Sequence, residues 1–269
     1  MEVKVLGPLE ARQNDTSVVP TAGKPRQILA LLALEAGQVV TVPTLIEELW
    51  SSRPPRSALT TLQTYILHLR RLIEAALPPG SPVVAREVLA TRPGGYRLEV
   101  DGLDVTEYER LAAEGTAAAE RGDDEAASRA LHAALALWRG PALLDVPAGI
   151  RLGIEAIRLE EGKVGVLELR IGADLRLGRH YTLLGELAKL TIRHPMHENL
   201  CAQFMLALYR SGQQWRALDA YKRLRDTLVA ELGLEPSARL QQLQQAVLRS
   251  DPALNESPIT GLQYERLAL

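Results

Sequence analysis

The sequence predicts a mainly α-helical protein with a small β component, in which a mixed N-terminal part precedes an all-helical C-terminal part. Alternating apolar and polar residues, typical of strands, occur only before about residue 102. After that point apolar residues recur at helical spacing, and glycines precede three similar helical segments. The 269 residues are enough for two domains with a substantial core in each.

The first forty residues predict a small sheet followed by a helix. The extended segments Val3–Ala11 and Ser17–Pro20 lie around a turn at Asn14-Asp15. Apolar residues at helical spacing then indicate a helix over Gly23–Glu35, which Gly37 ends. Val39–Thr41 follows as a short extended segment.

Two further helices follow, and the second is the most informative element. A proline in the first turn favours a helix over Pro43–Trp50. Pro54 and Pro55 then separate it from a long helix over Ser57–Ala76, which the Ser57 hydroxyl is expected to cap. The apolar stripe expected to be buried comprises Leu59, Leu62, Ile66, Leu69 and Ile73.

The opposite face of this long helix carries side chains that can contact the edges of DNA bases. Such a helix spans about 30 Å, enough to lie across a major groove. Leu67 lies on this side too, as a candidate contact for a thymine methyl or a neighbouring subunit. From this segment alone, an ordinary solvated face is the alternative. The residues expected to contact bases are Thr60, Gln63, Thr64, His68 and Arg71.

A β-hairpin follows the long helix. Val83–Ala85 and Val88–Thr91 are expected to be extended, Pro93-Gly94-Gly95 turns the chain, and Tyr96–Val100 alternates like a half-buried strand. Helix, short helix, long helix and hairpin together are the order of a winged helix-turn-helix domain. Phosphate contacts, including one from the tip of the wing, are expected from Lys24, Arg56, Tyr65, Arg70 and Arg92.

The second half predicts an all-α repeat domain. Gly122, Gly178 and Gly212 each precede a helix, and the last two lie 34 residues apart, the tetratricopeptide period. Such helix pairs bury a continuous core and leave a surface for a partner, although a purely structural spacer is the alternative. Helices are expected at about 104–121, 123–138, 148–177, 180–193, 197–210, 214–231 and 236–249.

Several motifs carry a family resemblance. TLQTYILHLRRLIE followed by TRPGGYRL resembles the OmpR-type winged helix, although we expect no phosphoacceptor receiver domain before it. The segments ALYRSGQQ, ALDAYKRLRDTL and ELGLEPSARLQQL resemble the bacterial transcriptional activation domain, a tetratricopeptide-like module. Together the two halves resemble the Streptomyces antibiotic regulatory protein family. The resemblance implies a winged-helix domain at 1–102 and an activation domain at 103–254, with a tail at 255–269 outside it.

The resemblance also implies a function. Members activate transcription of secondary-metabolite (antibiotic) gene clusters by binding tandem direct repeats near the promoter −35 region and recruiting RNA polymerase. The implied partners are double-stranded DNA, the polymerase holoenzyme with its sigma factor, and a second copy bound head to tail on DNA. By analogy, Arg53 and Arg56 are the implied polymerase contact. His68 stands where many relatives carry arginine. The alternative is a tetratricopeptide-type adaptor that binds protein only.

Charge limits how the chain can bind DNA. The net charge is −2, and residues 1–100 hold 11 basic and 9 acidic side chains. Bulk charge therefore does not indicate DNA binding, and the placement of a few basic groups must supply the phosphate contacts. A lone domain of this kind should bind weakly, so a dimer or a second bound protein is expected.

Other function classes find little support. The chain contains no apolar run of membrane-spanning length, no visible signal peptide and no phosphate-binding glycine loop, which favours a cytoplasmic, nucleoid-associated protein that is not an enzyme. His194, His197 and Cys201 have spacing that zinc could use, but Pro195 interrupts the helix they would need. We expect no cofactor and no metal, with Cys201 packed in a helix. The three tryptophans are expected to be core residues: Trp50, Trp138 and Trp215.

Overall fold

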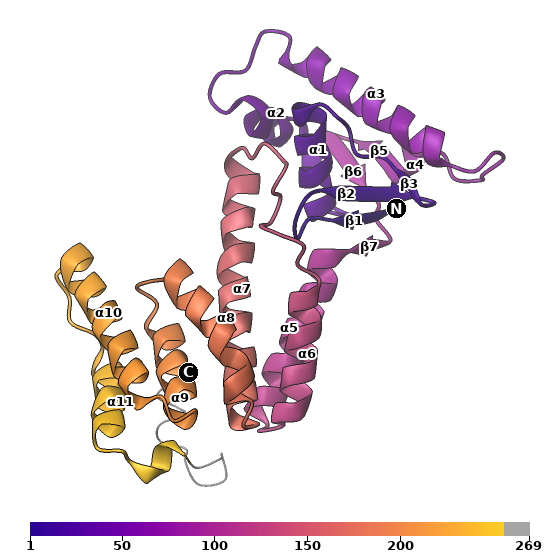
Figure 1. The fold of residues 1–269 in the computed structure, drawn as a ribbon. Helices are drawn as coiled ribbons and strands as arrows, with labels where there is room; N and C mark the ends of the chain where they lie inside the picture. Colours follow the sequence, from indigo (N-terminus) through magenta and orange to yellow (C-terminus); the bar gives the residue numbers. More distant parts are fainter. Residues whose placement is uncertain (256–269) are drawn as a thin grey trace. The chain divides into compact units, whose positions relative to one another are not determined.

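The computed structural model describes residues 1–255, which fall into two compact units. The first unit contains residues 1–111 and 134–163, and the second contains residues 112–133 and those from 164 onward. The predicted class, mainly α with a small β component, is confirmed (Figure 1). The first unit is not continuous along the chain, since residues 112–133 belong to the second unit, and it extends beyond the sequence boundary predicted at 102. The predicted tail lies, after Asn255, outside the described residues.

The first unit begins with a four-stranded sheet of order β3-β2-β1-β7. Asn14 and Asp15, with φ of 48° and 61°, form the predicted turn between β2 and β3. The extended segment predicted over Val3–Ala11 is interrupted, because the backbone N–H groups of Val5 and Leu6 donate to the Asp104 carboxylate instead of to a strand. The strands are β1 (Glu2–Lys4), β2 (Glu10–Gln13), β3 (Thr16–Ser17) and β7 (Gly102–Leu103).

The winged helix-turn-helix order is confirmed in the same unit. Strands β4, β6 and β5 form a second sheet, in which a Cβ on Gly95 would lie 2.1 Å from the Val40 carbonyl oxygen, so only glycine allows this approach. The extended segment predicted near Val83–Ala85 is partly wrong, because α4 forms there and Glu87 accepts from the Val84 N–H. The elements are α1 (Gly23–Leu34), β4 (Val40–Thr41), α2 (Val42–Trp50), α3 (Ala58–Ala76), α4 (Ala85–Val88), β5 (Leu89–Arg92) and β6 (Gly95–Leu98).

Helix α3 is anchored by one buried stripe. Its fully buried large side chains follow the predicted spacing, and Ala58 extends the stripe at the N-terminal end. Leu59 is 50% exposed, so its assignment to this stripe is wrong. It lies one residue after the buried Ala58, which turns it about 100° away from the stripe. The Ser57 hydroxyl makes no capping bond, which corrects a second expectation. The buried stripe is Ala58, Leu62, Ile66, Leu69, Ile73 and Ala76.

All seven helices predicted for the second half are present within a few residues. Trp215 was expected in the core but is 71% exposed, because it lies two residues, about 200°, from the buried Ala217. Cys201 is buried as predicted. The helices are α5 (Asp104–Glu120), α6 (Asp124–Ala136), α7 (Ile150–Arg176), α8 (His180–Arg193), α9 (Glu198–Arg210), α10 (Gln214–Leu232) and α11 (Ala238–Leu248), followed by a 3₁₀ turn, η1 (Pro252–Leu254).

The three glycines that predicted the repeats adopt one turn. Gly122, Gly178 and Gly212 have φ of 76°, 76° and 72°, a left-handed conformation that favours glycine. At each glycine, its own N–H donates to the carbonyl three residues back, and the next N–H donates to the carbonyl five residues back. Helices therefore end and restart in the same way at all three positions.

Candidate DNA-binding surface

Helix α3 presents a polar face on the side opposite its buried stripe. All five residues predicted to contact bases are exposed and share this face, because they recur every three or four residues. Figure 1 shows α3 at the outer edge of the first unit. Base contact itself stays a prediction for each of them. We define the outward face of α3 as Leu59, Thr60, Gln63, Thr64, Leu67, His68 and Arg71.

The groups on the outward face differ in what they offer a base edge. The Thr64 hydroxyl donates to the Thr60 carbonyl oxygen at 3.0 Å, so toward solvent it presents acceptor lone pairs and a methyl group. Gln63 carries both donors and an acceptor, and Arg71 carries a fork of donors. The face can therefore match several patterns of groups in the major groove.

Arg70 lies beside this face and ties the hairpin to α3. Its Nε and Nη2 donate to the Leu89 carbonyl oxygen at 2.9 and 2.8 Å, and Nη2 also donates to Thr91 Oγ1 at 2.8 Å. Burial, together with the charge of Arg86, lowers the pKa of Arg70. Because these donors are used within the protein, the geometry supports a positioning role. The predicted phosphate contacts of Arg70 and of the half-buried Tyr65 stay predictions.

The β5–β6 hairpin places Arg92 at its tip. Arg92 pairs with Gly95 across the turn, and Gly94 has φ of 80°, which a side chain would strain. The Arg92 side chain is exposed. The hairpin thus has the position and the terminal arginine expected of a wing that touches the DNA backbone.

The remaining predicted contacts lie in or near the loop that precedes α3. Every residue from Ser51 to Ser57 is exposed, including Arg53 and Arg56. The polymerase contact expected from these two arginines stays a prediction. Lys24, at the start of α1, places its Nζ 4.4 Å from the centroid of the Trp50 ring, a cation–π contact. This contact places the Lys24 ammonium group beside the end of α2, and its predicted phosphate contact stays a prediction.

Sequence reasoning missed the carboxylates that fix the first unit. Glu48 is 3% exposed, and its carboxylate accepts from the N–H groups of Gly149 at 2.7 Å and Arg151 at 2.8 Å, at the start of α7. Gln27 donates to the Glu48 carbonyl oxygen at 2.8 Å. A negative charge at a helix N-terminus is favourable, so Glu48 fastens α2 to α7. Glu48 lies three residues after the buried Leu45 and next to the buried Leu49, and this helical spacing is the sequence signal that it is buried.

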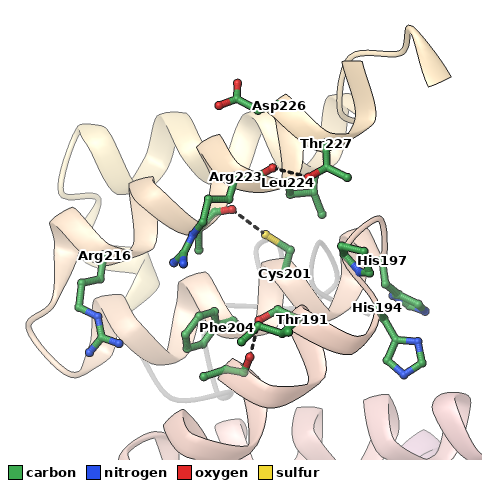
Figure 2. A pocket seen from close by; sticks show the side chains of 14 residues that line it. Thr191, His194, His197, Cys201, Phe204, Arg216, Arg223, Leu224, Asp226 and Thr227 are labelled. Carbon is green, nitrogen blue, oxygen red and sulfur yellow. Dashed lines mark hydrogen bonds between the residues drawn. The ribbon is translucent and has the colours of Figure 1, made fainter. Parts of the chain in front are cut away.

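The second unit contains a hollow of about 420 Å³ between α8, α9 and α10. Figure 2 shows Arg216 and Arg223 toward one end, with His194 and His197 toward the other. The Cys201 thiol donates to the Ala220 carbonyl oxygen at 3.6 Å, and burial raises its pKa to about 12, so it is protonated near neutral pH. A protonated thiol is a poor nucleophile.

Residues 1–255 show neither a metal-binding cluster nor a membrane-spanning helix. No group of three or more histidine, cysteine, aspartate or glutamate side chains in this range is placed to hold a metal ion. None of the helices in this range is both long and apolar enough to cross a bilayer.

The fold and the outward face together define a class of protein: a winged-helix DNA-binding domain joined to a tetratricopeptide-like helical domain. Residues 16–98 match the family described as transcriptional regulatory protein, C terminal, and residues 103–248 match the bacterial transcriptional activator domain. The chain belongs to the Streptomyces antibiotic regulatory protein family of transcriptional activators.

Individual relatives agree with this assignment. The chain is 58% identical to the regulatory protein DnrI of Streptomyces peucetius, over 96% of this chain and 95% of the relative. It is 38% identical to the regulatory protein AfsR of Streptomyces coelicolor, of which it spans 24%. The solved structure of Mycobacterium tuberculosis EmbR in complex with a low-affinity phosphopeptide matches with a TM-score of 0.86 and 34% identity, over 99% of this chain and 68% of that one.

Proposed function

We propose that this protein binds tandem direct repeats near the −35 region of a promoter and recruits RNA polymerase holoenzyme there, activating a secondary-metabolite gene cluster. One observation carries the DNA-binding part of the proposal. The five side chains predicted to contact bases lie exposed on one face of α3, while the opposite face of the helix forms part of the core of the first unit. A helix anchored along one side and polar along the other is suited to entering a major groove.

Two protomers are needed on this proposal. The basic groups near the outward face are few, and Arg70 already uses its Nε and Nη2 within the protein. Affinity for DNA rises with the number of phosphates neutralised, so a single first unit binds weakly. Head-to-tail packing of two copies on direct repeats adds the second set of contacts.

The polymerase contact is assigned to the exposed loop before α3, through Arg53 and Arg56. We place the protein in the cytoplasm, at the nucleoid, acting without a cofactor and without catalysis. The buried, protonated Cys201 thiol is a poor nucleophile, as this assignment requires. The family membership supports the activator role.

Footprinting and run-off transcription on the promoter beside its own gene test the proposal together. We expect two adjacent, evenly spaced protected sites and more transcript as the protein is added. Arg71→Ala should lower the affinity for each site about tenfold, as for loss of one charged DNA contact, and lower transcript with it. Arg53→Ala should keep occupancy without polymerase but lower transcript.

Arg249→Ala, at an exposed position after α11, is the matched control and should change neither readout. Absence of any protected site with the unaltered protein would refute DNA binding and favour the protein-only adaptor. Normal transcript from Arg53→Ala at full occupancy would refute the polymerase contact alone.

A further inference from the structure

The outward face of α3 contains two leucines among its polar side chains. Leu59 is 50% exposed and Leu67 is 47% exposed. Both lie in one row of the helix, four residues before and after Gln63, and Arg71 continues that row. The neighbouring row, Thr60, Thr64 and His68, is polar. Apolar and polar groups therefore alternate along the part of the surface that the proposed function directs at DNA.

Each leucine leaves about half of its surface in water, and the major groove offers one apolar group that can cover it. That group is the C5 methyl of thymine, because the other groups on the base edges in this groove are hydrogen-bond donors and acceptors. Contact between a leucine and this methyl removes apolar area of both from water. Cytosine lacks the methyl, so such a contact favours thymine.

A second protein is a poorer match for these leucines. The fully buried core of a protein interface is more apolar than the rest of the surface, whereas Leu67 lies between Gln63 and Arg71 in its row and beside His68. Thr64, three residues before Leu67, donates its hydroxyl proton to the Thr60 carbonyl oxygen of its own helix, with 3.0 Å between the two oxygens. The surroundings thus combine methyl groups with isolated donors and acceptors, the mixture that A·T-containing DNA displays.

We propose that Leu59 and Leu67 are specificity-determining residues that contact the C5 methyls of two thymines in the major groove. The inference rests on the proposed function, since it requires α3 to enter DNA. Eight residues separate the leucines, about 12 Å along the helix at 1.5 Å per residue. At 3.4 Å per base pair, that distance allows the two thymines to lie up to three or four steps apart.

Thymine-to-deoxyuridine substitution isolates the methyl, because deoxyuridine pairs in the same way and lacks only that group. The preferred duplex is first selected from random sequences with the full-length protein. Each thymine is then replaced singly, and the dissociation constant is measured. We expect two replacements in each repeat to weaken binding about fivefold, and the others less than twofold.

Variants then assign each methyl to its leucine. Leu67→Ala should bind more weakly and lose its sensitivity to one of the two replacements, and Leu59→Ala should lose sensitivity to the other. Leu234→Ala removes a leucine that is 58% exposed in the second unit, and it should keep both sensitivities. Thermal melting of each variant checks that the fold is unchanged.

Three results would overturn the inference. One is equal affinity, within twofold, for every deoxyuridine duplex. Another is undiminished sensitivity in both alanine variants. The last is Leu67→Ala lowering cooperativity between repeats with unchanged affinity for one repeat, which would assign Leu67 to the neighbouring protomer. Failure to select any duplex would instead refute the proposed function.

Discussion

The first unit joins residues about 100 positions apart through buried carboxylates, whereas the second unit repeats one local turn along the chain. Asp104 accepts from Val5 and Glu48 accepts from Gly149, contacts that span 99 and 101 residues. In the second unit, Gly122, Gly178 and Gly212 adopt the same turn with the same hydrogen bonds. The comparison shows two ways to hold a surface in place: hydrogen bonds between segments that are distant in the sequence, and repetition of one local turn.

This difference decides what could be predicted from the sequence. A glycine turn and the helical spacing after it are local, so all seven helices of the second half could be predicted. The spacing of apolar residues in α3 also fixed which face is buried, and hence which residues lie outward. Leu59 was misassigned because one turn of spacing cannot distinguish it from Ala58, its buried neighbour.

The long-range contacts could not be predicted in the same way. Nothing in the segment around Glu48 indicates that its partners are the first amides of α7. Similarly, the interruption after β1 depends on Asp104, nearly a hundred residues later. Arg70 was assigned to DNA because its bonds to Leu89 and Thr91 exist only once the hairpin has folded back on α3.

The largest effect on this comparison is expected from Glu48→Ala. The change removes a buried carboxylate that accepts from two N–H groups at the start of α7, and a hydrogen bond to a charged group contributes about 1.5–3 kcal/mol. We expect the free energy of unfolding to fall by about 3 kcal/mol in chemical denaturation. DNA affinity should fall as well, because α2 packs against α3.

Glu47→Ala is the matched control, on the same helix but exposed. Its carboxylate makes a 3.9 Å ion pair with Arg151, worth about 0–1 kcal/mol at the surface. A loss as small for Glu48→Ala as for Glu47→Ala would show that the carboxylate does not hold the first unit together.

A smaller effect is expected in the second unit from Gly178→Ala. A Cβ there meets no atom within 4 Å, so the cost comes only from the left-handed backbone, about 1 kcal/mol. Gly185→Ala, in the interior of α8 and equally uncrowded, should raise stability by about 0.5–1 kcal/mol. Thermal unfolding of the two variants measures whether each one loses or gains stability. Equal shifts in the same direction would refute the role assigned to the repeated turn.

The central claim is that the outward face of α3 contacts duplex DNA, and photocrosslinking tests it most directly. p-Benzoylphenylalanine is placed at Gln63, on that face, or at Gln242, an exposed glutamine of α11. Each full-length variant is irradiated on the selected duplex at equal occupancy. We predict crosslinks to bases of the repeat from position 63 and none from position 242. Specific binding without a crosslink from position 63 would contradict the account.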